Sequence, residues 1–272
     1  MCKPNLVERI QSRKAVINFL GAALLVFWGP LITVNTIYSP VPGYASSELF
    51  DGEEIVRRVD QIRVPNADFT VEVKLESENS RGSKETRAYT VMMNRNRDSL
   101  VKTIAPVSEK GQTMLMRGQD FWVYLPATGQ PIRLSLSQKL VGPVSNGDIA
   151  RMSFSEDYSV EKQELQGEDS DAIAVLTLKP KGDWVTYEQV VLYVSLTTSR
   201  PIKAQFFTAT GILLKSCEFS EYKSLGGAIR PTQLVIVDAI GKGEKSKLLY
   251  SDMREATIPN RYFTKEYMQK IE

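Results

Sequence analysis

The feature that most constrains this chain is an alternation of apolar and polar residues with a period of two, repeated in about a dozen segments. In DFTVEVKLES, residues 68–77, four apolar side chains from Phe69 to Leu75 alternate with polar ones. A strand with one face buried and the other in water has this pattern. Short turns containing Gly, Pro, Asn or Ser join most of the segments, so hairpin should follow hairpin. The sequence therefore predicts a mainly β protein built on an antiparallel meander, with few helices.

One segment departs from this pattern because neither of its faces is polar. In DFWVYLP, residues 120–126, Trp122 and Tyr124 share one face while Phe121 and Val123 share the other. A strand with apolar residues on both faces needs shelter on both sides. We therefore expect other parts of the protein to cover each face.

Two stretches follow a different period. Residues 46–63 predict a helix, with Asp51 as its N-cap and an apolar stripe from Ile55 to Ile62. Residues 138–171 show no sustained alternation, and we expect a loop there with short helical turns. A long connection inside a tight meander is usually a lid or a binding loop and not a linker. Residues 46–272 are therefore predicted to form a single domain.

The N-terminal residues are typical of an export signal. Basic residues from Lys3 to Lys14 precede an apolar run over residues 15–38, and Gly43 and Ala45 are the small residues that favour cleavage after Ala45. An uncleaved anchor in the inner membrane is the alternative, because the run is long enough to span a bilayer. We expect residues 1–45 to be a signal peptide or an anchor. Either way, the rest of the chain is predicted to be exported to the periplasm or cell envelope.

The composition excludes several classes of function. The chain has no histidine, which rules out histidine triads, histidine metal sites and histidine general bases. Without residues 1–45 the chain is close to electrically neutral, so no nucleic-acid partner is predicted. Cys217 then remains as a lone cysteine and is predicted to be a buried structural thiol. We expect no catalytic residue, no metal and no cofactor, and the protein is not predicted to be an enzyme.

The order of several motifs resembles a known family. Residues 114–142, MLMRGQDFWVYLPATGQPIRLSLSQKLVG, combine an alternating strand, a Trp-x-Tyr-x-Pro element and a basic residue before the next strand. SRPIKAQFF, GILLKSCEFSEYKSLGGAIRP and LLYSDMREATIPNRYFTKEYM follow in the order that the C-terminal half of that family shows. The chain resembles the LolA-like outer-membrane lipoprotein-sorting proteins over most of residues 50–268. The resemblance implies a curved antiparallel sheet forming an incomplete barrel, with helices and a lid loop closing a hydrophobic cavity on its concave side.

The expected cavity lining combines this resemblance with the distribution of methionines. Five methionines fall within residues 92–152, and their unbranched side chains suit a pocket for acyl chains of varying conformation, although simple core filling explains them equally well. The acyl-chain site is predicted to comprise Met92, Met114, Met116, Trp122, Tyr124, Leu134, Leu136, Met152 and Phe154.

Three functions are compatible with these patterns. The first is a non-enzymatic carrier that shelters the acyl chains of lipoproteins or lipids during transport to the outer membrane. Its expected partners are an inner-membrane transporter and an outer-membrane acceptor, and we expect a monomer. The alternative is a structural accessory subunit of an envelope transporter. A carbohydrate-binding module that uses Trp122 and Tyr124 as stacking platforms is the third.

Overall fold

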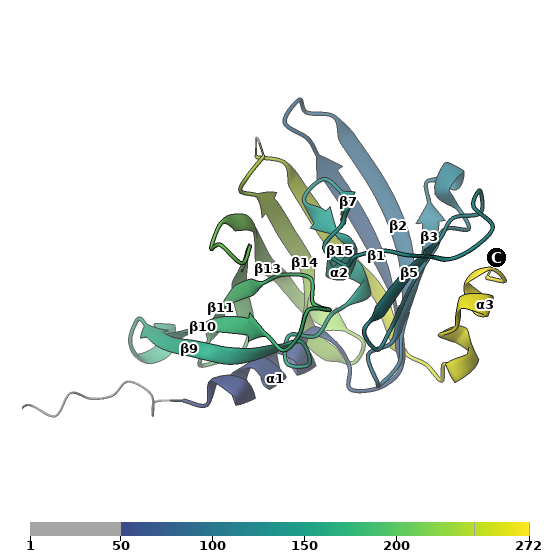
Figure 1. The fold of residues 1–272 in the computed structure, drawn as a ribbon. Coiled ribbons are helices and arrows are strands. Elements are labelled where there is room, and N and C mark those ends of the chain that lie inside the picture. Colours follow the sequence, from purple (N-terminus) through teal and green to yellow (C-terminus); the bar gives the residue numbers. More distant parts are fainter. Residues whose placement is uncertain (1–49, 242, 272) are drawn as a thin grey trace, which may run out of the picture. The chain divides into compact units, whose positions relative to one another are not determined.

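A single curved antiparallel sheet dominates the computed structural model, which describes residues 50–241 and 243–271 (Figure 1). Thirteen strands form this sheet, and two short strands, β7 and β8, form a separate ribbon. The strands are β1 (Phe69–Glu78), β2 (Lys84–Met93), β3 (Ser99–Ala105), β4 (Thr113–Arg117), β5 (Asp120–Tyr124), β6 (Ile132–Arg133), β7 (Lys139–Val141), β8 (Val144–Ser145), β9 (Tyr158–Gln166), β10 (Ile173–Pro180), β11 (Gln189–Ser195), β12 (Pro201–Phe207), β13 (Leu213–Leu225), β14 (Ala228–Asp238) and β15 (Lys245–Glu255).

The predicted meander is confirmed, with one long-range pairing at its centre. The order across the sheet is β6-β5-β4-β3-β2-β1-β15-β14-β13-β12-β11-β10-β9. Every neighbouring pair is consecutive in the chain except β1 and β15, which pair in antiparallel register from Phe69↔Glu255 to Glu78↔Lys245. The sheet curves but does not close into a barrel, because β6 and β9 remain as separate edges.

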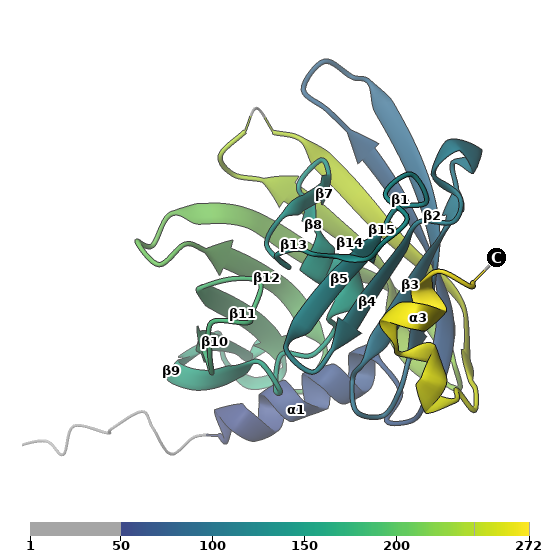
Figure 2. The ribbon, with the colours of Figure 1, turned by 45° about the vertical axis from the view of Figure 1, so that its right-hand side comes forward.

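Helix α1 (Gly52–Arg63) lies across one end of the sheet and contacts β9 and β14 (Figure 2). The predicted N-cap is confirmed, since the Asp51 carboxylate accepts a hydrogen bond from Glu54 N at 3.1 Å. Ile55, Val56 and Val59 are buried in the main core on the concave side. Residues 46–49 of the predicted helix, and the predicted signal or anchor over residues 1–45, lie outside the described residues. Within the described part, no helix has the length and hydrophobicity needed to cross a membrane.

The expectation of a loop throughout residues 138–171 is wrong for residues 158–166, which form the edge strand β9. Most of the C-terminal half of β9 is exposed, and its polar residues lie on both faces, so the sequence has no period-two signal there. Pairing with β10 supplies the hydrogen bonds that make it a strand. The rest of the stretch matches the expectation more closely, because it contains the short ribbon of β7 and β8 and the one-turn helix α2 (Asn146–Ala150).

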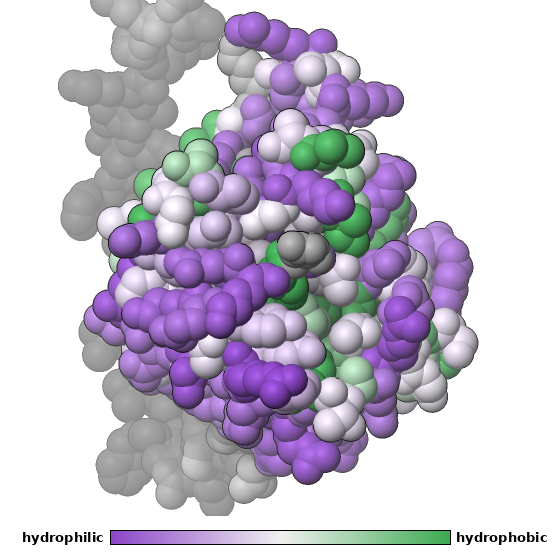
Figure 3. All heavy atoms as spheres, turned by 90° about the vertical axis from the view of Figure 1, so that its right-hand side faces the viewer, coloured by the Kyte–Doolittle hydropathy of each residue, from purple (hydrophilic) through white to green (hydrophobic). Residues whose placement is uncertain are grey.

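The C-terminal segment covers the outer face of the sheet. It includes the 3-10 turn η3 (Asn260–Tyr262) and the short helix α3 (Lys265–Met268), which lies outside β3 and β4 (Figure 2). Phe263 and Met268 are fully buried there against Leu100 and Leu115, in a second core separate from the concave one. Figure 3 views the molecule from the side of α3 and shows a mostly hydrophilic surface with hydrophobic residues gathered near its middle.

This arrangement explains why β5 is apolar on both faces. Phe121 is buried in the main core on the concave side. Trp122 and Tyr124 pack in the outer core, where the ammonium of Lys265 lies 4.2 Å from the centre of a Trp122 ring. The expectation that both faces are covered is confirmed.

Candidate functional site

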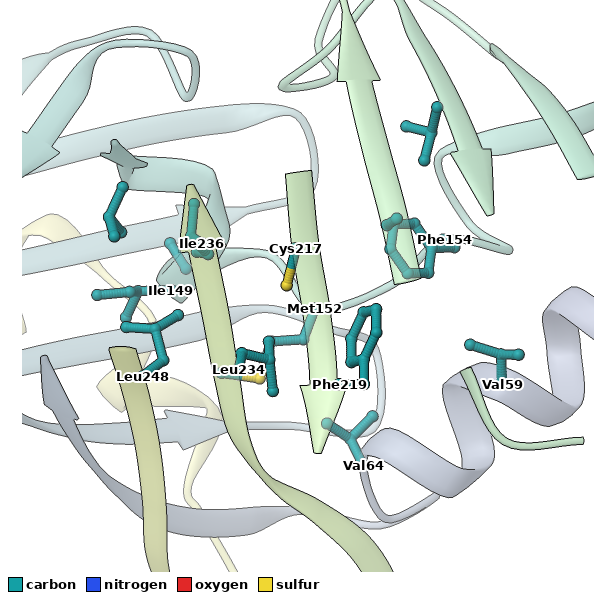
Figure 4. Close-up of a cluster of buried hydrophobic side chains, with 14 of the residues drawn as sticks. Val59, Val64, Ile149, Met152, Phe154, Cys217, Phe219, Leu234, Ile236 and Leu248 are labelled. Carbon is teal, nitrogen blue, oxygen red and sulfur yellow. The ribbon is translucent and has the colours of Figure 1, made fainter. Parts of the chain in front are cut away.

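The interior of the curved sheet contains a small cavity between β12–β15, α2 and the segment over residues 151–158. Figure 4 shows several of the buried side chains around it, among them Phe154, Cys217 and Phe219. The volume of the cavity is about 50 Å³. A water molecule needs roughly 10–15 Å³ of such space, so the cavity has room for a few waters but not for a long chain. Its walls are mainly apolar but carry four charged side chains, each of which forms an ion pair: Arg63, Asp148, Arg151 and Asp157. The lining residues are Arg63, Gly147, Asp148, Arg151, Ser153, Phe154, Asp157, Tyr158, Thr186, Tyr187, Phe206, Cys217, Phe219, Leu234, Ile236 and Leu248.

Six of the nine residues predicted to line an acyl-chain cavity lie on the concave side of the sheet. Phe154 lines the cavity itself, and Met152 is buried beside it (Figure 4). Met114, Met116 and Leu136 are buried in the same core, against which the partly buried Leu134 packs.

The other three predicted residues lie on the opposite face of the sheet. Met92, Trp122 and Tyr124 pack against the C-terminal segment in the outer core. The sequence showed that these residues alternate with Phe121 and Val123, but not which of the two sets faces the interior. The structure therefore does not bring all nine residues together.

A buried ion pair joins α2 to the sheet, and the sequence analysis missed it. Lys215 on β13 donates to the Asp148 carboxylate at 2.5 Å and to the Pro143 carbonyl at 2.7 Å. The Tyr187 hydroxyl donates to the other Asp148 oxygen at 2.6 Å. Both charged side chains are more than 90% buried. In the alternating pattern of β13, Lys215 falls on the same face as Cys217, which lies in the core. This was the signal in the sequence that Lys215 is buried.

A second polar cluster fixes the segment after α2. The Asp60 carboxylate on α1 accepts hydrogen bonds from Ser153 Oγ at 3.0 Å, from Phe154 N at 3.0 Å and from Ser155 N at 2.7 Å. Arg63, one turn later, donates to the Met152 carbonyl at 3.2 Å. Its guanidinium also lies 4.6 Å from the centre of the Phe154 ring. One turn of α1 therefore holds residues 152–155 in place.

Burial controls the titration of several groups around the cavity. It raises the pKa of the Cys217 thiol to about 12. It also raises the pKa of Asp157, although the hydrogen bond from Arg151 at 2.6 Å opposes this shift. The prediction that Cys217 is buried is confirmed, and its neutral thiol is not a good nucleophile at neutral pH.

The described residues contain no group of three or more acidic, cysteine or histidine side chains that could hold a metal ion. The polar groups of the cavity instead bind one another. Asp148 and Asp60 each bind groups from a different element, so these carboxylates connect α2 to the sheet and residues 153–155 to α1. The interior of the sheet is therefore apolar, and the hydrogen bonds that hold α2 and residues 153–155 over it are polar.

Comparison with known proteins places this geometry in a family. A family model described only as "Uncharacterized protein" matches residues 95–270. The LolA superfamily protein NE2245 from Nitrosomonas europaea is 38% identical over 80% of this chain and 99% of its own, with a TM-score of 0.76. The chain belongs to the LolA superfamily. The expected family resemblance is thereby confirmed.

Two other solved structures share the fold of this LolA superfamily protein. A domain named as an outer membrane lipoprotein-sorting protein, from Vibrio parahaemolyticus, is 21% identical over 80% of this chain and 98% of its own, with a TM-score of 0.68. A DUF1329 family protein from Desulfovibrio piger is 23% identical over 80% of this chain and 98% of its own, with a TM-score of 0.67. No curated protein gives a significant sequence match to the chain.

Proposed function

We propose that this protein is a non-enzymatic carrier that shelters acyl chains of lipoproteins or lipids as they cross the periplasm to the outer membrane. The observation that carries the proposal is an apolar interior, enclosed by a curved sheet, in a chain that belongs to the LolA superfamily. A relative named for lipoprotein sorting shares the fold and supports the same cargo. Residues 1–45 then act as the export signal, and the partners are an inner-membrane transporter and an outer-membrane acceptor.

The energetics of transit favour an enclosed carrier. Burial of a methylene contributes about 0.8 kcal/mol, so a long acyl chain exposed to water would cost on the order of 10 kcal/mol. The interior cavity of about 50 Å³ is too small to hold such a chain. Loading therefore requires α2 and residues 151–158 to move away from the sheet. The acyl chain then contacts the six predicted residues on the concave side, which are Met114, Met116, Leu134, Leu136, Met152 and Phe154.

The same filled interior favours a second candidate, an accessory subunit of an envelope transporter that holds no cargo. Organic extraction of the protein purified from the cell envelope, followed by mass spectrometry of the extract, distinguishes the two. The carrier should release lipid in stoichiometric amounts and should bind a fluorescent fatty acid after delipidation. An extract without lipid, together with no fatty-acid binding, would contradict the carrier and favour the accessory subunit.

A further inference from the structure

A groove lies at the rim of the sheet, outside the interior cavity. Pro143 in the turn between β7 and β8, Leu214 on β13 and Ile240 after β14 contribute its apolar walls, and Tyr187 and Lys215 lie along it. We call it the rim groove. Its volume is about 350 Å³, within the range of roughly 300–1,000 Å³ for small-molecule pockets. The interior cavity, at about 50 Å³, is far smaller.

A thin wall of side chains separates the rim groove from the interior cavity. Tyr187 lines both spaces, while Lys215 lines the groove and its partner Asp148 lines the cavity. The Lys215 ammonium lies 4.9 Å from the centre of the Tyr187 ring. The groove therefore continues the interior across the Lys215–Asp148 ion pair.

The chemistry of the groove favours an apolar occupant. An ammonium group has three N–H donors, and those of Lys215 have three acceptors, since Ser145 Oγ at 3.4 Å joins Pro143 and Asp148. The buried cation thus offers no spare donor to a polar ligand. Ile240 is 64% exposed, so this large apolar side chain lies in water at the mouth of the groove. Lys139, which also lines the groove, is exposed and forms an ion pair with Glu244 at 3.6 Å. Because such exposed pairs are weak, an anionic head group outside the groove can replace Glu244 as its partner.

We propose that the rim groove binds one acyl chain of the cargo while the interior is still closed. The inference rests on the proposed carrier function. It adds a site that the acyl chain occupies before Tyr187, Lys215 and Asp148 move apart and open the interior. Its occupant is a fatty acyl chain lying against Leu214 and Ile240, with its polar end toward Lys139.

Titration of the full chain with cis-parinaric acid tests this proposal, using Ile240→Glu and the matched control Ile229→Glu. Ile229 is also exposed, at 48%, but lies at the far end of β14 from the groove. A carboxylate beside an acyl chain loses water without gaining a partner, so Ile240→Glu should weaken binding about tenfold or more. Ile229→Glu should stay within about twofold of the parent, and both variants should keep the parent's circular dichroism.

The outcomes separate the groove from the carrier function itself. Selective weakening by Ile240→Glu supports the groove. If the parent binds but the two variants have equal affinities, the groove is not the site, while the carrier function stands. If the delipidated parent binds no fatty acid, the carrier function fails and the groove proposal falls with it.

Discussion

The ammonium of Lys215 lies 2.5 Å from a carboxylate oxygen of Asp148, with both side chains buried between α2 and β13. Loss of one partner leaves the other charge without compensation in the core, which costs about 3–5 kcal/mol. We therefore expect Lys215→Met to lower the free energy of unfolding by about that amount, measured by urea denaturation. The double variant Lys215→Met with Asp148→Asn should recover part of the loss. A loss in the double variant equal to the sum of the losses in Lys215→Met and Asp148→Asn alone would show that the two charges are not coupled.

Removal of the Asp60 carboxylate should loosen residues 153–155 without unfolding the sheet. Asp60→Ala deprives the amides of Phe154 and Ser155 of their acceptor, and each buried unpaired donor costs about 1–3 kcal/mol. Hydrogen exchange followed by mass spectrometry should show faster exchange in this segment and little change in β13 or β14. Glu54→Ala, on the exposed face of the same helix, serves as the control and should leave the segment protected. Unchanged protection in Asp60→Ala would mean that the carboxylate does not anchor residues 153–155.

Cys217 should make the fold less stable at alkaline pH. Burial raises the pKa of its thiol from an ordinary value of about 9 to about 12, so between these values the unfolded chain loses the proton while the folded chain keeps it. Because the folded state then binds more protons, its stability falls as pH rises above about 9, by roughly 1.4 kcal/mol per pH unit. Cys217→Ala should therefore lose less stability than the parent between pH 8 and pH 10 in urea titrations. Identical losses would place the thiol in contact with water.

Trp122→Ala should release the C-terminal segment but leave acyl-chain binding unchanged. The Trp122 ring packs in the outer core and under Lys265, so its loss should cost about 2 kcal/mol, less than for a fully buried tryptophan. Limited trypsinolysis should then cut faster at the exposed Arg261 and Lys265. Loss of fatty-acid binding in a variant that still folds would show that Trp122 belongs to the lipid-binding site after all.

Met116 and Leu134, both on the concave side of the sheet, should respond differently to an introduced carboxylate. Met116 is fully buried, so Met116→Glu should abolish the cooperative melt. Leu134 is only partly buried beside the main core, and Leu134→Glu should keep the melt and weaken binding of cis-parinaric acid. A folded Leu134→Glu variant with the parent's affinity would place the cavity wall elsewhere.

The sequence predicted the sheet well because its central strands are buried on one face. Along β1, buried side chains alternate with partly or fully exposed ones, and this alternation is what a sequence period of two reports. β9 escaped detection because most of its side chains lie in water, and β8 because two residues show no period. Strand pairing, and not local sequence, defines these elements.

The candidate site was harder to predict because alternation separates two faces without telling which one is interior. The outer face of β5 faces a C-terminal segment more than 130 residues away, at Phe263 and Met268. Lys215 and Asp148 lie 67 residues apart and become partners only when α2 folds onto β13. No local pattern reports such a distant pairing.

The pairing of β1 with β15 has a consequence for how the sheet assembles. All other pairs in the sheet join strands that follow one another in the chain, so each half can form hairpin by hairpin. The β1–β15 pairing, which we call the seam, cannot form until residues 245–255 are present. A chain that ends before them would carry two half-sheets, each with a long unpaired edge where the seam belongs, and such edges are templates for aggregation. The seam thus makes completion of the whole chain a condition for burying the middle of the sheet.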